Sequence, residues 1–275
     1  MSLDLAFSVD GRSVIVTGAA SGLGLAFSEV MAEHGARVTL TDLDEDRLAR
    51  EVDRLSAMGF AVTGAKLDVT NRTSVDSVFD AAADRQGGLD IVFANAGIDP
   101  GPGYAATNAQ GERSEENRIE HYADERWHKV IAVSLDAVFY SVRAATRHMR
   151  PRRSGSIVVT TSISAVRPAV TLGAAYMASK AGAAHLVRSA ALELAADNVR
   201  INAIAPGPFE TNIGGGLMHK EEVRNAFAAA VPMRRVADVA EIKPLALYLA
   251  SNASSFVTGQ QFVIDGGLSL SSSRS

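Results

Sequence analysis

Tyr176 and Lys180 lie four positions apart in the segment Tyr-Met-Ala-Ser-Lys, which opens an alanine-rich stretch. In a helix, this spacing puts both side chains on one face. A neighbouring ammonium group lowers the pKa of a phenol from about 10 toward neutrality. The pair could therefore act as a general acid and base on an alcohol or carbonyl oxygen. Such pairs also occur by chance on surface helices, so the pair alone leaves that interpretation open.

A hydroxyl group that could join this pair follows the apolar run Ile157–Val159. Ser162 would lie at the carboxyl end of a buried strand, fourteen positions before Tyr176, and could hydrogen-bond a substrate oxygen. Thr161 and Ser164 are rivals for this role, because alternation along an extended chain puts 162 and 164 on the same side. An ordinary turn hydroxyl is the remaining interpretation.

The segment Thr17–Gly24 contains three glycines between the apolar run Val14–Val16 and a stretch with helical spacing, Leu25–His34. A glycine-rich turn between a strand and a helix lets the backbone and the helix N-terminus approach a pyrophosphate. The alternative is a close strand-to-helix crossing that binds no ligand.

Asp42 ends the second apolar run and could accept hydrogen bonds from the ribose hydroxyls of an adenosine. Its carboxylate would repel a 2′-phosphate, and neither the segment Ala19–Gly24 nor the positions beside Asp42 contain a Lys or Arg. The nearest basic residue, Arg47, is expected on a solvated helix face. These features favour NAD over NADP. The alternative is that Asp42 is a helix N-cap or a turn residue, a role that Asp44 could fill equally well.

The elements that must position these residues are predicted by seven apolar runs that alternate with helical patterns. The runs are Val14–Val16, Val38–Leu40, Ala61–Leu67, Ile91–Ala94, Ile157–Val159, Ile201–Ala205 and Phe262–Ile264. Helical patterns include Leu25–His34, Asp44–Met58 and Asn71–Gln86. Continuous apolar strands indicate burial on both faces, so we expect one doubly wound, mostly parallel sheet that spans residues 1–275 as a single domain.

Three segments depart from this regular pattern. Asp99–Tyr122 is rich in Gly, Pro, Asn and charge and is expected to be a surface excursion. The region 208–235 is expected to be a mobile substrate loop, in which Phe209, Ile213, Leu217 and Met218 would form an apolar lid, or else a simple solvent loop. The tail 269–275 is expected to fray.

Composition excludes several classes of function. The chain has 27 basic and 31 acidic residues and a net charge of -4, which disfavours nucleic acid and membranes as partners. No apolar run approaches the roughly 18 residues of a membrane span, so we expect a cytoplasmic protein. There is no cysteine, and the six histidines show no metal-ligand spacing, so no catalytic metal is expected.

Together, these motifs resemble the short-chain dehydrogenase/reductase family across about residues 11–268. The motifs are TGxxxGxG at Thr17–Gly24, Asn-Ala-Gly at 95–97, Ser162, YxxxK at 176–180, PGxxxT at 206–211 and Asp-Gly-Gly at 265–267. The resemblance implies a Rossmann fold and a nicotinamide cofactor. It also implies a homo-oligomer, a tetramer or dimer.

By matched position, the resemblance implies that Tyr176 is the acid/base, that Lys180 is its pKa partner and a ribose ligand, and that Ser162 orients the substrate. Asn95–Gly97 are expected to back the adenosine side, and Asp68 to contact the adenine. The implied cofactor-binding residues are Gly18, Ser21, Gly22, Leu23, Gly24, Asp42, Leu43, Asp68, Val69, Asn95, Ala96, Gly97, Tyr176, Lys180, Pro206, Gly207, Phe209 and Thr211.

The chain departs from the family pattern in two places. Ser134 stands where the family commonly has an Asn that holds a water in the proton path, and this shorter hydroxyl could still hold that water or could slow proton exchange. The span from Gly97 to Trp127 is also about ten residues longer than the resemblance leads us to expect. The excess could be a variable loop, a subunit contact or one wall of the substrate site.

We therefore expect an NAD-dependent oxidoreductase that transfers a hydride between the cofactor and a secondary alcohol or ketone. The apolar lid hints at a cyclic or hydrophobic alcohol. Two alternatives are an NAD-binding sensor or scaffold with lost or weak turnover, and an epimerase or dehydratase that works through transient oxidation.

Overall fold

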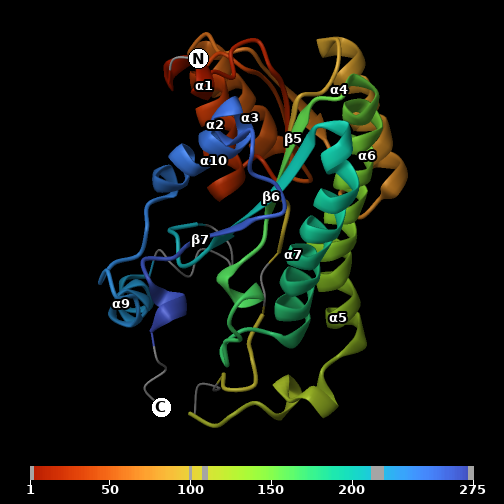
Figure 1. Cartoon of the computed structure of the whole chain (residues 1–275). Helices are drawn as coiled ribbons and strands as arrows, with labels where there is room; N and C mark the ends of the chain where they lie inside the picture. Colours follow the sequence, from red (N-terminus) through yellow and green to blue (C-terminus); the bar gives the residue numbers. More distant parts are fainter. Residues whose placement is uncertain (1–2, 99–100, 107–110, 212–219, 272–275) are drawn as a thin grey trace.

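The strands form one seven-stranded parallel sheet in the computed structural model, which describes residues 3–98, 101–106, 111–211 and 220–271. Its order is β3-β2-β1-β4-β5-β6-β7 (Figure 1). The strands are β1 (Ser13–Thr17), β2 (Arg37–Asp42), β3 (Val62–Lys66), β4 (Ile91–Ala94), β5 (Gly155–Thr160), β6 (Val199–Pro206) and β7 (Gln261–Ile264). The predicted Rossmann-like fold, a doubly wound parallel sheet, is confirmed.

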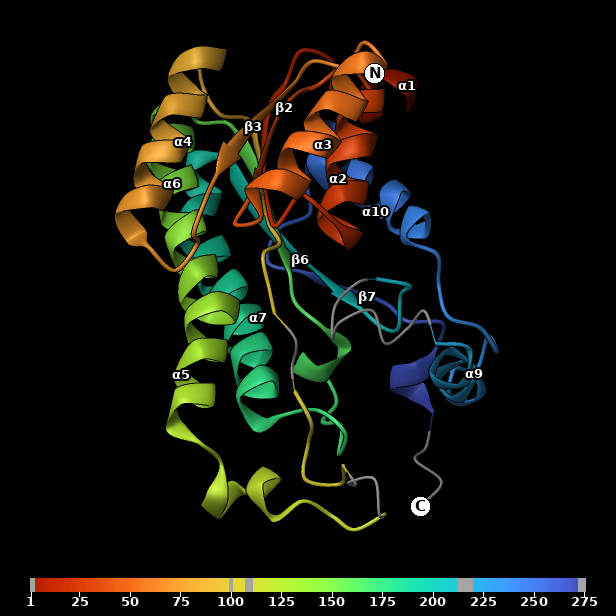
Figure 2. The ribbon, with the colours of Figure 1, turned by 180° about the vertical axis from the view of Figure 1, so that it is seen from behind.

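Helices cover both faces of this sheet (Figures 1 and 2). The described α-helices are α1 (Leu3–Phe7), α2 (Gly22–Glu33), α3 (Glu45–Ala57), α4 (Arg72–Gln86), α5 (Asp124–Ile131), α6 (Ala137–Arg152), α7 (Ala174–Leu194), α9 (Glu221–Ala230) and α10 (Lys243–Ala250). In β1, Val14 and Val16 pack into a core shared with α2, α3 and α10, whereas Ile15 packs into a second core with α4, α6 and α7. This alternation explains why the middle of the strand, Val14–Val16, is apolar at consecutive positions.

Strand order reverses at β1, which has β2 on one side and β4 on the other. In an open parallel sheet, ligands bind at such a switch point, outside the carboxyl ends of the strands. The carboxyl ends of β1, β4, β5 and β6 are Thr17, Ala94, Thr160 and Pro206. These ends carry the motifs predicted to bind the cofactor and substrate.

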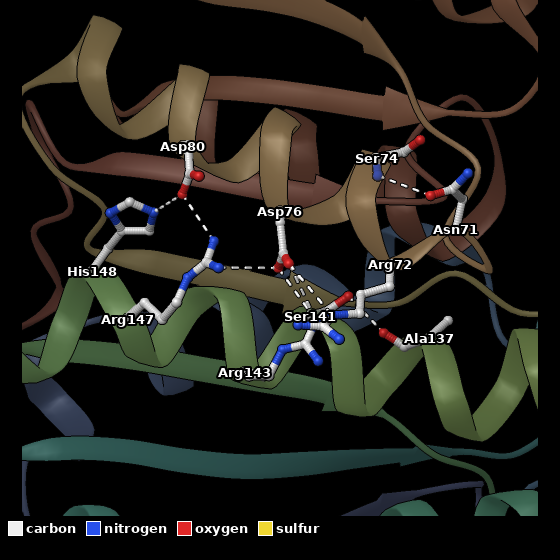
Figure 3. A network of polar contacts seen from close by, with 10 residues as sticks. All are labelled: Asn71, Arg72, Ser74, Asp76, Asp80, Ala137, Ser141, Arg143, Arg147 and His148. Carbon is white, nitrogen blue, oxygen red and sulfur yellow. Dashed lines mark hydrogen bonds and ion pairs between the residues drawn. The ribbon is translucent and has the colours of Figure 1, made fainter.

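A network of charged side chains joins α4 to α6 (Figure 3). Asp76 contacts Arg72 at 3.7 Å, Arg143 at 3.3 Å and Arg147 at 3.4 Å, and only 18% of its side chain is exposed. The more exposed Asp80 pairs with Arg147 and His148. The network therefore holds α4 and α6 together on one face of the sheet.

Two segments expected to be irregular contain ordered parts. The region 208–235 contains α9 instead of only a loop, because an alanine-rich stretch follows Glu221 and Glu222, which favour a helix N-terminus. The start of the tail is held in place, since Arg167 donates hydrogen bonds to the carbonyls of Leu268 (2.9 Å) and Ser271 (2.6 Å). The rest of the tail, 272–275, lies outside the described residues.

No helix among the described residues is both long and apolar enough to cross a membrane.

Candidate active site

The glycine-rich turn is shaped by close contacts within the protein. Gly18 has φ +65°, and a Cβ added there would lie 2.9 Å from Ala96 Cα. A Cβ on Gly24 would clash with the Gly18 carbonyl. Ser21 precedes α2 without a side-chain cap, so the first N–H groups of this twelve-residue helix remain without that partner. Such a helix start suits a pyrophosphate, and the residues present therefore fit a dinucleotide.

Asn95 joins the ends of three strands beneath this turn. Its side-chain amide donates to the carbonyls of Thr17 (3.1 Å) and Gly18 (3.2 Å), and its side-chain oxygen accepts from the Thr160 hydroxyl at 2.9 Å. The Thr17 hydroxyl in turn accepts from the backbone N–H groups of Asn95 and Ala96. The predicted site residue thus supports the turn from inside, and sequence reasoning missed Thr17 and Thr160 as its partners.

Asp42 lies between the glycine-rich turn and α3. Its carboxylate accepts from the backbone N–H groups of Ala20 and Asp44, both at 3.0 Å. Asp44 caps α3 by accepting from the N–H of Arg47, and the Arg47 guanidinium lies 3.6 Å from the Asp44 carboxylate. The alternative that Asp42 caps the helix is therefore wrong, because Asp44 takes that place.

Other predicted adenosine contacts lie at the ends of β2 and β3. Leu43 is 62% exposed, and Asp68 is exposed, with its carboxylate accepting hydrogen bonds from the N–H and hydroxyl of Thr70. Val69 is partly buried against the second core. Gly97 was expected on the adenosine side, but a Cβ added there would lie 3.6 Å from Lys180 Nζ, so this end of the Asn-Ala-Gly motif adjoins the Tyr-Lys pair.

Tyr176 and Lys180 lie in the first two turns of α7 and contact one another. The Lys180 ammonium nitrogen is 5.6 Å from the centre of the Tyr176 ring and donates to the Thr160 carbonyl at 2.9 Å. Only 3% of Lys180 is exposed, and this burial lowers its pKa to about 8. A buried amine held beside a phenol can stabilise a phenolate while it remains protonated.

Ser162 lies two residues beyond the carbonyl that holds Lys180. It is 7% exposed, and its hydroxyl oxygen accepts from the Ser164 N–H at 3.1 Å. The hydroxyl of its rival Thr161 instead donates to the Ile204 carbonyl at 3.0 Å. The alternation argument for Ser164 is wrong, because the chain turns into a 3-10 helix, η4 (Ile163–Ala165), that packs against α7. Ser164 nevertheless has a buried hydroxyl that finds no hydrogen-bond partner in the part of the chain that the structure describes.

Ser134 lies in a π-helical turn, η3 (Ala132–Asp136), between α5 and α6. It is fully buried, and its hydroxyl has no hydrogen-bond partner among the described residues. This turn packs against α7, the helix that carries the Tyr-Lys pair. π-Helical turns often mark functional sites, and an unpartnered buried hydroxyl fits a bound water.

The segment that follows β6 reaches the glycine-rich turn. A Cβ on Gly22 would lie 3.4 Å from the Thr211 side chain, and the Gly207 N–H donates to the Ile264 carbonyl at 2.9 Å. Phe209 is 4% exposed and packs in the first core, so its predicted place in an apolar lid is wrong. The other predicted lid residues, Ile213, Leu217 and Met218, lie outside the described residues.

Within the described part of the chain, no group of three or more His, Asp or Glu side chains could hold a metal ion.

The fold and this site define a Rossmann-type enzyme, and comparisons with known proteins identify its family. A profile of the family described as enoyl-(acyl carrier protein) reductase matches residues 18–269. The chain belongs to the short-chain dehydrogenase/reductase family. It is an oxidoreductase that acts on alcohol or ketone substrates with a nicotinamide cofactor.

Three similar proteins illustrate the range of this family. The cis-4-hydroxycyclohexanecarboxylate dehydrogenase of Sinomonas cyclohexanicum is 38% identical over 260 residues, which cover 93% of this chain and 96% of that protein. A 3-oxoacyl-(acyl-carrier-protein) reductase of Chlamydia pneumoniae is 32% identical over 262 residues, covering 94% and 97%. The crystal structure of a gluconate 5-dehydrogenase from Burkholderia cenocepacia, in complex with NADP and tartrate, has a TM-score of 0.85 and 30% identity, covering 98% and 99%.

Proposed function

We propose that the protein is an NAD-dependent dehydrogenase of a cyclic secondary alcohol, with Tyr176, Lys180 and Ser162 as its reacting and orienting groups. The observation that carries this proposal is the position of Lys180. Its buried ammonium group lies against the Tyr176 ring and is held by a carbonyl two residues before Ser162.

When bound, a nicotinamide ring accepts or returns the hydride. Ser162 hydrogen-bonds the substrate oxygen and holds it near Tyr176. The Tyr176 phenolate accepts the hydroxyl proton as the alcohol is oxidised, and the phenol returns it when the ketone is reduced. Lys180, mainly protonated below its pKa of about 8, favours the phenolate by its charge.

Ser134 belongs to the proton path in this proposal. Its buried, unpartnered hydroxyl can bind one water, and that water would carry protons between α7 and the solvent.

The preference for NAD is supported by the charges around Asp42. Its carboxylate would repel a 2′-phosphate, and nearby basic groups already have acidic partners: Arg47 pairs with Asp44, and Lys66 with Glu45. The gluconate 5-dehydrogenase in complex with NADP shows that a similar fold also accepts the phosphorylated cofactor. The cofactor would be held by the glycine-rich turn, Asp42, Asp68, the 95–97 motif, Tyr176, Lys180 and the segment 206–211.

The substrate class rests on the relative that is 38% identical over nearly the whole chain. Its name specifies a hydroxyl group on a cyclohexane ring. Large exposed apolar side chains, Tyr104, Val166 and Val170, lie on segments next to the start of α7 and would suit such a ring.

A homo-oligomer, either a tetramer or a dimer, is also part of this proposal. Exposed apolar side chains on α5, α6 and α7 support it: Trp127 is 37% exposed, Phe139 46% and Leu192 85%. Light scattering should give a multiple of the 28.9 kDa chain mass.

The test is absorbance in the NADH band with purified protein, a panel of cyclic and open-chain secondary alcohols, and NAD or NADP. We expect NADH formation from cyclic alcohols and a clear preference for NAD. Tight NADH binding without any turnover would instead support the alternative of a sensor or scaffold. Faster turnover with NADP would contradict the role proposed for Asp42.

A further inference from the structure

The long connection between β4 and α5 is paired with the segment that leads into the catalytic helix. Pro102 and Leu172 form an antiparallel bridge. The N–H of Gly103 donates to the Thr171 carbonyl at 3.0 Å, and the N–H of Gly173 donates to the Gly101 carbonyl at 3.1 Å. Gly173 caps α7 three residues before Tyr176. We refer to the described parts of this connection, 101–106 and 111–122, as the insertion. The insertion lies where α5 and α7 begin (Figures 1 and 2).

At Gly103, the backbone of the insertion approaches the backbone of Val170 and Leu172 too closely for any side chain to fit. A Cβ there would clash with the Val170 carbonyl and would lie 2.6 Å from the Leu172 carbonyl. Glycine is required because two backbones meet at this point, and not because of its φ angle. The insertion is therefore fitted to the segment before α7 at backbone level, unlike a variable loop.

Arg126, in the first turn of α5, contacts both described parts of the insertion. Its guanidinium donates to the Pro102 carbonyl at 2.7 Å and to the side-chain oxygen of Asn117 at 3.0 Å, and it lies 4.7 Å from the centre of the Tyr122 ring. Asn117 is 6% exposed. None of the ion pairs found in the described structure includes Arg126. Its planar guanidinium group thus binds the insertion and not a carboxylate.

The paired segments bring apolar surface to the neighbourhood of the catalytic helix. Tyr104, on the insertion, is 51% exposed, and Val170, on its partner segment, is 49% exposed. Val166, which follows η4, is 56% exposed. Large apolar groups left in contact with water beside a catalytic centre suit the apolar body of a substrate.

We propose that the docked insertion is a specificity wall for alcohols with a bulky apolar body, and that Arg126 is the positioning residue that holds it in place. This inference rests on the proposed function. The hydrogen bonds and the ring contact found for Arg126 are all with the insertion. Its loss should therefore impair the binding of a bulky alcohol and leave the hydride transfer from a small alcohol to NAD unchanged.

The experiment compares Arg126→Met and Gly103→Ala, which undock the insertion from two independent positions. Arg118→Met is the matched control, because Arg118 lies in the insertion and pairs at the surface with Glu115. Each variant is assayed with NAD and either 4-methylcyclohexanol or 2-propanol. Hydrogen–deuterium exchange of peptides covering 101–106 and 169–175 measures docking without requiring turnover.

We expect faster exchange in both peptides for Arg126→Met and Gly103→Ala. For both variants, the ratio of kcat/KM for 4-methylcyclohexanol to that for 2-propanol should fall about tenfold, mainly through KM for the cyclic alcohol, while Arg118→Met keeps the wild-type ratio. Faster exchange with an unchanged ratio of kcat/KM values would show that the insertion is not a specificity wall. Unchanged exchange in Arg126→Met would overturn the anchoring role. If the wild type oxidises neither alcohol, the proposed function fails, and the exchange data still decide whether Arg126 anchors the insertion.

Discussion

The ammonium group of Lys180 donates a hydrogen bond to the backbone carbonyl of Thr160 at 2.9 Å. This bond ties α7, the helix that carries Tyr176 and Lys180, to the end of β5. The same strand end leads directly to Ser162. Thr160 is also bonded through its hydroxyl to Asn95, which holds the glycine-rich turn. The proposed substrate and cofactor sites therefore share one rigid support.

Lys180→Met should change how stability depends on pH. Burial lowers the pKa of Lys180 to about 8 in the folded protein, from 10.5. Between these values the unfolded chain binds more protons, so the free energy of unfolding should rise with pH. Relative to Lys180→Met, the cofactor-free wild type should gain roughly 2 kcal/mol between pH 8 and 9.5.

Urea unfolding of both proteins across this pH range measures that gain. A difference between the two proteins that does not vary with pH would show that Lys180 titrates normally.

Asp42→Asn should weaken the preference for NAD. The amide keeps an acceptor for one of the two backbone N–H groups but removes the charge that repels a 2′-phosphate. We expect the ratio of kcat/KM for NADP to that for NAD to rise at least about tenfold. Asp46→Asn is the control, since it removes a carboxylate from the first turn of α3 but keeps Asp42 and the pair between Asp44 and Arg47, and it should leave the ratio within about twofold of the wild type.

Ser134→Ala should slow turnover with little effect on stability. Loss of the bound water should lower kcat about fivefold and raise its solvent isotope effect, while the free energy of unfolding should change by no more than about 1 kcal/mol because that water satisfies the hydroxyl in the wild type. Steady-state kinetics in H₂O and D₂O, together with urea unfolding, provide these values.

Ser13→Ala is the matched control, because its hydroxyl is also buried and unpartnered but lies at the amino end of β1, away from the site. It should change stability alone. An unchanged kcat in Ser134→Ala would remove Ser134 from the proton path.

Asp76→Asn should destabilise the contact between α4 and α6. Asp76 faces three arginines with 18% of its side chain exposed, so loss of its charge removes the acidic partner of Arg72 and Arg143 and leaves Arg147 with Asp80 alone (Figure 3). We expect a loss of about 1–2 kcal/mol, larger than that for Asp80→Asn, whose side chain is 52% exposed. Thermal unfolding of both variants tests this order, and a larger effect at Asp80 would contradict it.

The fold could be predicted from the sequence because burial on both faces leaves a continuous apolar run for each central strand. Ile15 shows the principle: it is apolar although it faces the opposite side from Val14 and Val16. The glycine-rich turn and the Tyr-Lys spacing could be predicted for a similar reason, since local backbone geometry determines both. The catalytic roles and the preference for NAD stay predictions.

Features that depend on tertiary contacts could not be predicted. Phe209 looked like part of a lid, but it is buried because the chain turns back into the first core after β6. Thr17 and Thr160 become partners of Asn95 only when three distant strand ends meet. The docking of the insertion depends on a side chain of the next helix, Arg126, which no local pattern distinguishes.

The central claim is that Tyr176 transfers the proton, and Tyr176→Phe tests it most directly. The change removes one hydroxyl group and keeps the ring beside Lys180; Tyr140→Phe on α6 is the control. Initial rates of NADH formation from a cyclic secondary alcohol should fall at least about a thousandfold in Tyr176→Phe. The rate of the control should stay within about twofold of the wild type. NADH affinity and thermal unfolding should be unchanged in both variants. If Tyr176→Phe keeps more than about a tenth of the wild-type turnover, another group transfers the proton and the proposed mechanism is wrong.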